Sequence, residues 1–403
     1  MEKRSESLDS QQEKGILPPG WHYDEDTGAI MRDVIHRMGR RCFAWDYCCR
    51  AAYLVTMTLA DRSRPLFGRL VGQSAKTAAI ELTELGHAID AHMRRIGDFT
   101  PEIEVLGIQL MPEHLHAVLR VKQRMKKPLG IALRGFKGGA SQIYWRLCAC
   151  TNHEPLFSEG YVDNILGDEE AVTKALCYIA DNPRRLWEKH AHPELFKVLR
   201  DIEVKLAVCT ASANSVAPVV QTTGHFSAIG NLSLLQEANI FQVQCSRSFF
   251  AYNRASDGTL LKDAPPAIVT KEYEEKRNGF LEAAEHGAVL LSPCISHGER
   301  EIARLAFIKG LKVITLANKG FNPLYKPGGK LFNPCANGNL LMLAPAAWPY
   351  IPGEKKMTRE DACVLNRIGQ WLAGTGAVDI RYCGIEPRKV DELAFAAIQI
   401  SPS

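Results

Sequence analysis

The 403-residue sequence predicts two domains that both combine helices and strands but differ in architecture. In the first half, short apolar strands and amphipathic helices follow one another in the order β-α-β-β-α-β, with one helix added at the end. That order is typical of an α+β ferredoxin-like sandwich. In the second half, continuously apolar strands alternate with helices, which is typical of an α/β domain whose parallel sheet is covered on both faces.

Hydrophobic periodicity and helix caps define the elements of the first domain. The expected elements are strands at 53–59, 103–110, 115–121 and around 156–161, and helices at 74–96, 129–147 and 168–181. Pro183 disfavours helical backbone at the residue before it, so Asn182 is predicted to be the last residue of the third helix. Residues 183–200 then continue as a separate basic and aromatic helix.

The second domain follows a segment of small and polar residues that reads as a linker. Its expected elements are strands at 240–244, 288–291, 313–316 and 340–343, and helices at 271–286, 299–309 and 358–372. The predicted organisation is a partly disordered leader at 1–45, a first domain at 46–205, a linker at 206–224 and a second domain at 225–403.

Composition places the chain among ordinary globular proteins, with 46% hydrophobic and 23% charged residues. No apolar run approaches the roughly 18 residues needed to cross a bilayer, and the polar N-terminus has no signal-peptide core. We therefore expect a cytoplasmic protein without a membrane partner. The twelve cysteines are scattered and form no C-x-x-C pair, which disfavours a zinc site and disulfides.

His114-Leu115-His116 is the most informative motif, because it lies in a predicted strand where apolar residues alternate. Side chains two apart on a strand share a face, so both imidazoles project in the same direction. Two such histidines form part of a metal site that still lacks its other ligands. The alternative is a pair of ordinary surface or core histidines.

Tyr178 and Asn182 are four residues apart on the predicted helix at 168–181 and share one helical face. A tyrosine beside a metal-bound phosphate can act as a covalent nucleophile, and an amide oxygen one turn away can complete the metal's ligands. The alternative is a buried tyrosine followed by an Asn-Pro turn.

The net charge of +4 is too small to indicate nucleic acid, but its distribution is informative. Between residues 120 and 146 there is no Asp or Glu, which makes this stretch suited to a phosphate backbone or, alternatively, a solvated basic loop. Tyr144 and Trp145 could stack on unpaired bases or lie in the core. The candidate DNA-binding residues are Arg120, Lys122, Arg124, Lys126, Lys127, Lys137, Arg184 and Arg185.

In their order and spacing, these motifs resemble the HUH single-strand transposases, and the nearest branch is the REP-associated tyrosine transposases. The resemblance covers about residues 50–200 and includes the first strand, Tyr53-Leu54-Val55-Thr56-Met57-Thr58, and the segment Tyr178-Ile179-Ala180-Asp181-Asn182-Pro183. Glu113 departs from the family, which more often has Asn there. We expect Glu113 on the opposite strand face from the histidines, as a weak candidate for the general base.

The resemblance implies a metal-dependent enzyme that nicks and rejoins single-stranded DNA near a hairpin, and it allows for a homodimer. Tyr178 would form a 5'-phosphotyrosine link, while His114, His116 and Asn182 would bind Mg²⁺ or Mn²⁺. Imidazole ligands favour Mn²⁺ over Mg²⁺. Lys137 would position a phosphate, and Arg184 and Arg185 would hold the strand.

The second half resembles the Rossmann-like domain of the DNA-processing protein A family, in a degenerate form. Cys245 and Pro293 stand where that family has glycines, so the backbone cannot approach a phosphate as closely. The segments 246–247 and 328–330 could still hold one. Two alternatives therefore remain open: a hairpin-binding protein that no longer cuts, and a nucleotide-processing protein that acts through its second half.

Overall fold

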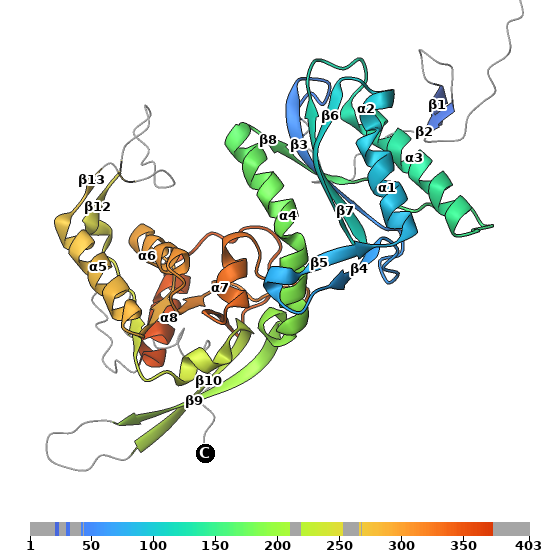
Figure 1. Ribbon diagram of the computed structural model, residues 1–403. Coiled ribbons are helices and arrows are strands. Elements are labelled where there is room, and N and C mark those ends of the chain that lie inside the picture. Colours follow the sequence, from blue (N-terminus) through green and yellow to red (C-terminus); the bar gives the residue numbers. More distant parts are fainter. Residues whose placement is uncertain are drawn as a thin grey trace, which may run out of the picture. The chain divides into compact units, whose positions relative to one another are not determined.

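The computed structural model describes residues 21–23, 30–32, 42, 44–209, 219–252, 266 and 268–373. It is a mixed α/β protein with several sheets (Figure 1). The chain divides into two compact units, one comprising Met1–Gln73 with Thr77–Pro183 and the other comprising Ser74–Lys76 with Arg184–Ser403. Within the described residues, no helix is both long enough and apolar enough to cross a membrane.

An antiparallel sheet of four strands forms the centre of the first unit (Figure 1). Its order is β6 (Ile103–Met111), β7 (His114–Val121), β3 (Ala51–Thr58) and β8 (Val162–Leu166). β7 is therefore internal, with β3 and β6 paired to it on either side. An internal strand is held by hydrogen bonds along both edges, so it gives the side chains on it a rigid base.

The two faces of this sheet carry different cores, because side chains alternate along each strand. Tyr53 of β3 and Leu119 of β7 belong to the larger core, which α1 (Glu84–Arg94) and α3 (Leu129–Leu147) cover. On the opposite face, apolar residues of β3 and β7 pack against α4 (Glu169–Ala191); the buried members are Ala52, Leu54, Val118, Val172, Ala175 and Ile179.

Gly107 of β6 allows α4 to approach the sheet closely. A Cβ atom at this position would lie only 2.6 Å from Leu176 Cδ2 and 3.3 Å from Ile179 Cδ1. The register of β6 against β7 shifts between Val105 and Gly107, and this bulge helps to bring Gly107 opposite Val118 on the face that α4 covers.

Three expected elements of the first unit are wrong in detail. The expected helix at 74–96 is replaced at its start by the hairpin of β4 (Gly68–Val71) and β5 (Ala79–Leu82). α1 begins at Glu84, since the Thr83 hydroxyl accepts a hydrogen bond from the Gly86 N–H and caps the helix. A short helix, α2 (Ile96–Phe99), follows it.

The strand expected around 156–161 lies instead at Val162–Leu166, as β8. Leu156 and Phe157 are apolar because they are buried in the larger core, with a single bridge from Phe157 to Leu59. Asn182 does not end its helix, since α4 continues through Pro183 to Ala191. A proline inside a helix removes one backbone hydrogen bond, which packing on both sides of it can offset.

The second unit contains a six-stranded mixed sheet in the order β11-β14-β15-β16-β10-β9. Four of its strands are parallel: β11 (Ile240–Gln242), β14 (Val289–Ser292), β15 (Val313–Leu316) and β16 (Leu340–Pro345). α5 (Lys271–Glu285) and α6 (His297–Ile308) pack on one face, and α8 (Arg359–Leu372) packs on the other. The short helix α7 (Phe332–Ala336) precedes β16.

Much of the expected linker at 206–224 is strand. Residues 206–209 end β9 (Leu199–Cys209), and residues 219–224 begin β10 (Val219–Gly230), which pairs with it in an antiparallel hairpin. β-branched residues such as Val208, Val219 and Val220 favour strand, and they outweigh the small polar residues on which the linker prediction rested. Residues 210–218 and the expected leader up to residue 41, apart from the short strands β1 (Trp21–Tyr23) and β2 (Ile30–Arg32), lie outside the described residues.

Candidate active site

His114 and His116 bring their rings together on the face of the sheet that α4 covers. Their Nε2 atoms lie 3.1 Å apart, and the two rings are nearly perpendicular at 87°. Two nitrogen ligands at right angles, each roughly 2.1 Å from one ion, would lie about 3 Å from each other. The spacing of the two Nε2 atoms therefore fits adjacent ligands of a single metal ion.

The outer nitrogen of each ring is held by a neighbouring side chain. His116 Nδ1 shares a 2.8 Å hydrogen bond with the hydroxyl of Thr56, its partner across the β3–β7 ladder. His114 Nδ1 lies 3.2 Å from a carboxylate oxygen of Glu113, in the turn between β6 and β7. The expected place of Glu113 on the opposite strand face is therefore wrong, because this residue lies in the turn and not in the strand.

Burial and hydrogen bonding set the charge states at this pair. Burial, together with the neighbouring His114, lowers the pKa of His116 to about 3, so this ring is neutral at physiological pH. The hydrogen bond from His114 lowers the pKa of Glu113, which keeps that carboxylate ionised. A neutral imidazole is the form that binds metals.

Tyr178 lies beside the histidine pair, from α4. Its ring centre is 5.9 Å from that of His116, edge to face, and the side chain is 39% exposed. α4 runs antiparallel to β7, since Arg120 near the end of β7 contacts Glu169 at the first turn of α4 at 2.7 Å. α4 rises about 13 Å from Glu169 to Tyr178, and β7 spans about 13 Å from Arg120 back to His116. Tyr178 and His116 therefore lie at the same level.

Asn182 follows Tyr178 by one helical turn and should therefore lie at the level of His114 by the same register. It is buried, with 9% of its surface exposed. Its side-chain nitrogen is also buried and has no hydrogen-bond partner among the described residues. The oxygen and nitrogen of a side-chain amide exchange places when the group turns by 180°. In that orientation the Asn182 oxygen would take the buried position, where a cation could bind it.

The residues present therefore fit a divalent ion held by two imidazoles and one amide oxygen. In the described part of the chain, no three His, Cys, Asp or Glu side chains gather into a metal-binding group.

Two of the basic residues expected to bind DNA are held in ion pairs. Arg120 pairs with Glu169, and Arg124 pairs with Asp46, each at 2.7 Å. Lys122 and Lys126 are exposed. Lys126 and Lys127 also line a cavity of about 570 Å³ formed mainly by residues of α1, α2 and α3.

Lys137, which is predicted to position a phosphate, holds a loop. Its ammonium donates hydrogen bonds to the carbonyl oxygens of Ser158 (2.5 Å) and Gly160 (3.0 Å). Burial lowers its pKa. Ser158 in turn shares a 2.8 Å hydrogen bond with Thr58, which is paired with His114 across the β-ladder. Lys137 thus supports the strand end next to the histidines.

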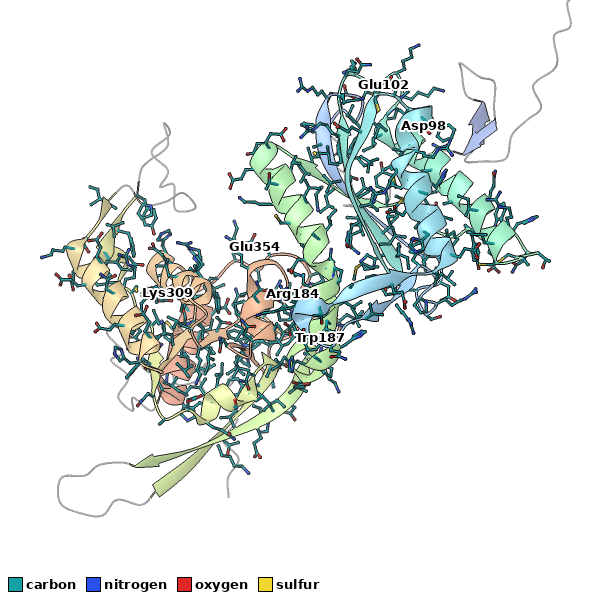
Figure 2. The ribbon with its side chains drawn as sticks, in the orientation of Figure 1. Asp98, Glu102, Arg184, Trp187, Lys309 and Glu354 are labelled. Atoms are coloured by element: carbon teal, nitrogen blue, oxygen red, sulfur yellow. The ribbon has the colours of Figure 1, made fainter. Side chains whose placement is uncertain are left out.

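Arg184 and Arg185 pack within the second unit. Figure 2 shows Arg184 and Trp187 on the later turns of α4. Arg184 donates a hydrogen bond to the Asn333 side chain, and the Arg185 guanidinium lies 3.9 Å from the centre of the Phe332 ring. Both arginines therefore contact α7, and their role in DNA binding stays a prediction.

Tyr144 and Trp145, at the end of the basic stretch, do not form a stacking surface. Tyr144 is only 5% exposed and belongs to the larger core, while the Trp145 indole donates a hydrogen bond to the Glu154 carbonyl oxygen. The core alternative is the correct one for Tyr144.

The loop after β14 in the second unit begins at Pro293, where the resemblance would place a glycine and a bound phosphate. Its backbone N–H groups are already used, because the Glu299 carboxylate accepts hydrogen bonds from Ile295 (2.8 Å) and Ser296 (3.2 Å). The same carboxylate also accepts one from the Cys245 N–H at 3.4 Å. An internal carboxylate therefore stands where an external anion would have to bind.

Sequence reasoning did not assign Thr56 to the site, and it named Glu113 only as a weak candidate for the general base. The signal for Thr56 was available, because Thr56 and Thr58 alternate at the polar end of β3 just as the histidines do on β7. The contact of Glu113 depends on the geometry of a two-residue turn, which the sequence pattern did not specify.

No known family's sequence profile matches the chain. It is 24% identical over 178 residues to an uncharacterized protein of Haemophilus influenzae strain ATCC 51907, a match that covers 39% of this chain and 92% of that protein. Among solved structures, it is similar to a REP-associated tyrosine transposase bound to a REP hairpin, with 15% identity, a TM-score of 0.26 and coverage of 36% of this chain and 72% of that one. A Deinococcus radiodurans R1 protein provisionally described as a transposase is similar at 13% identity, with a TM-score of 0.23 and coverage of 36% and 97%.

Proposed function

We propose that the first unit is a ferredoxin-like HUH nuclease that nicks and rejoins single-stranded DNA, with Tyr178 as its nucleophile. One observation carries the proposal: two histidine Nε2 atoms 3.1 Å apart and a half-exposed tyrosine share one face of a rigid sheet. The second unit is a degenerate Rossmann-like domain. Because Glu299 occupies backbone N–H groups of the loop after β14, where the resemblance would place a phosphate, we place the chemistry in the first unit.

The reaction exchanges one phosphodiester for another. The phenol oxygen of Tyr178 gives up its proton and bonds to the phosphorus, while the bond from phosphorus to the 3'-oxygen breaks and that oxygen takes up a proton. The product is a 5'-phosphotyrosine and a free 3'-hydroxyl, so the later rejoining step requires no nucleotide cofactor. Phenols are weak acids and attack as phenolates, so the Tyr178 hydroxyl must lose its proton as it attacks.

His114, His116 and Asn182 would hold Mg²⁺ or Mn²⁺ beside the reacting phosphate. When bound, such an ion neutralises charge that develops on the phosphoryl oxygens. The protein's own contribution is position. β7 fixes both imidazoles, α4 carries the nucleophile at the same level, and the exposure of Tyr178 leaves room for a DNA strand. Lys122 and Lys126 are exposed cations that would contact its phosphates.

Covalent capture of labelled DNA tests the proposal. The full chain is incubated with Mn²⁺ and single-stranded hairpins from its genomic flanks, and a denaturing gel detects label that remains attached to protein. We expect an adduct with the wild type and none with Tyr178→Phe, while hairpin binding persists. Tyr350→Phe, which alters an exposed tyrosine of the second unit, is the matched control and should form the adduct.

The outcome separates the proposal from its alternatives. Hairpin binding without an adduct or cleavage in the wild type would indicate a protein that no longer cuts. Cleavage by Tyr178→Phe at the wild-type rate would show that another group is the nucleophile.

A further inference from the structure

We infer that Glu113 and Thr56 are positioning residues that fix the two imidazoles as a preformed pair of metal ligands. This inference rests on the proposed metal site at His114 and His116, and it goes beyond that proposal by assigning roles to two side chains that would not touch the metal. Each of them contacts the Nδ1 atom of one ring, on the side opposite the paired Nε2 atoms.

The hydrogen bond at His114 determines which of its nitrogens carries the proton. An ionised carboxylate can only accept hydrogen bonds, so Nδ1 of His114 must donate its proton to Glu113. The Nε2 atom then presents a lone pair toward His116. A carboxylate in this position orients a metal-binding histidine and makes its free nitrogen a better ligand.

The turn that carries Glu113 is itself held in place. The carbonyl oxygen of Glu113 accepts a hydrogen bond from the Leu59 N–H at 3.0 Å, and that of Pro112 accepts one from the Phe67 N–H at 3.2 Å. The carboxylate therefore starts from a fixed backbone, and it loses less freedom when it engages His114 than a residue in a mobile loop would.

Thr56 acts in the same way on the second ring. It is paired with His116 across the β3–β7 ladder, and the two side chains share a face. Its hydroxyl reaches His116 Nδ1 at 2.8 Å, and the ring is only 6% exposed, so few other orientations remain open to it. A hydroxyl can donate or accept, so Thr56 can adjust when a metal requires the Nδ1 atom of His116 to carry a proton.

Both rings therefore have their outer nitrogens occupied, so their inner nitrogens converge on one point before any metal arrives. Loss of such an outer partner typically weakens metal affinity 10- to 100-fold. Most of the effect should come from the hydrogen bonds that hold the two rings, so a side chain that keeps the hydrogen-bonding group should retain most of the affinity. A glutamine at position 113 keeps an acceptor oxygen, and a serine at position 56 keeps the hydroxyl.

Mn²⁺ binding to the full chain, measured by calorimetry or electron paramagnetic resonance without DNA, tests this inference. We expect Glu113→Ala and Thr56→Val each to weaken Mn²⁺ affinity by about 10- to 100-fold. Glu113→Gln and Thr56→Ser should retain most of it. Glu104→Ala, which removes an exposed carboxylate from the other end of β6, is the control and should bind as the wild type does.

Each outcome has one meaning. Wild-type affinity in both Glu113→Ala and Thr56→Val would overturn the positioning role. Equal loss in Glu113→Gln and Glu113→Ala would also overturn it, since an acceptor oxygen that holds the ring would then not be what preserves the affinity. Thr56→Val keeps the shape of the threonine, so it remains informative if thermal melting shows that Glu113→Ala does not fold. If the wild type binds no Mn²⁺, the proposed metal site fails, and not merely its outer partners.

Discussion

Gly107→Ala should shift the nucleophile relative to the histidines, because the new methyl group needs space that side chains of α4 occupy. The added Cβ would lie 2.6 Å from Leu176 Cδ2, whereas carbon atoms in ordinary contact are about 3.5–4.0 Å apart. The shortfall is therefore about 1 Å. Leu176 can rotate to relieve part of it, but Ile179 Cδ1, at 3.3 Å, must also move. Because both residues flank Tyr178 on α4, a shift of the helix moves the nucleophile.

The substitution changes the free energy of unfolding in two opposite directions. Overpacking typically costs about 1–3 kcal/mol. Removing a glycine from a strand interior recovers roughly 0.5–1 kcal/mol. We therefore expect a net loss of up to about 2.5 kcal/mol in urea unfolding. A misplacement of about 1 Å can lower a reaction rate by about 100-fold, so adduct formation should fall by up to this factor.

A second substitution identifies the cause. Leu176→Ala makes room for the new methyl group, so the double variant should recover adduct formation relative to Gly107→Ala alone. Gly138→Ala on α3 is the matched control, since a Cβ there meets no atom within 4 Å. It should stabilise the protein by up to about 1 kcal/mol and leave the adduct rate unchanged. Wild-type stability and rate in Gly107→Ala would refute the argument that close approach of α4 positions Tyr178.

Three further changes test the electrostatics of the first unit. In the presence of a chelator, the wild type should lose about 2 kcal/mol more stability than His116→Gln when the pH falls from 7.5 to 5. In the unfolded chain the His116 ring binds a proton below about pH 6.5, whereas in the folded protein its pKa of about 3 keeps it neutral. Parallel urea-unfolding curves for the two proteins would contradict this. Lys137→Met removes two hydrogen bonds and should lower the free energy of unfolding by about 1–3 kcal/mol, with no change in the salt dependence of hairpin binding. Lys126→Ala should do the reverse, reducing the slope of log affinity against log salt by about one while stability stays unchanged, and an unchanged slope would remove Lys126 from the DNA contact.

The sequence was informative where structure follows from local periodicity. The range expected for α3 agrees with the structure, and the strands around the histidines agree to within one or two residues. The shared face of His114 and His116 follows from strand alternation alone. Most elements of the second unit were also predictable, because continuous apolar runs such as Val313–Leu316 occur only where both faces of a strand are covered.

Local patterns were misleading where distant contacts decide the outcome. The local pattern of residues 79–82 predicts helix, but these residues form a strand that pairs with β4. The pattern at Leu156 and Phe157 predicts strand, but these residues are buried core residues in a loop. Pro183 predicted a helix end, but α4 continues through it. In each case the energy that decides the conformation comes from a partner far along the chain, which a local window does not contain.

By itself, the sequence determined which residue types are available for chemistry and which of them share a strand face or a helix face. Only the tertiary structure decided which of these groups meet. It brought Tyr178 beside His116, gave the imidazoles their partners Glu113 and Thr56, and turned Lys137 toward backbone carbonyls. The physical reason is that side-chain direction along an element follows from its local period, whereas hydrogen bonding, burial and the resulting charge states depend on neighbours that the packed fold supplies.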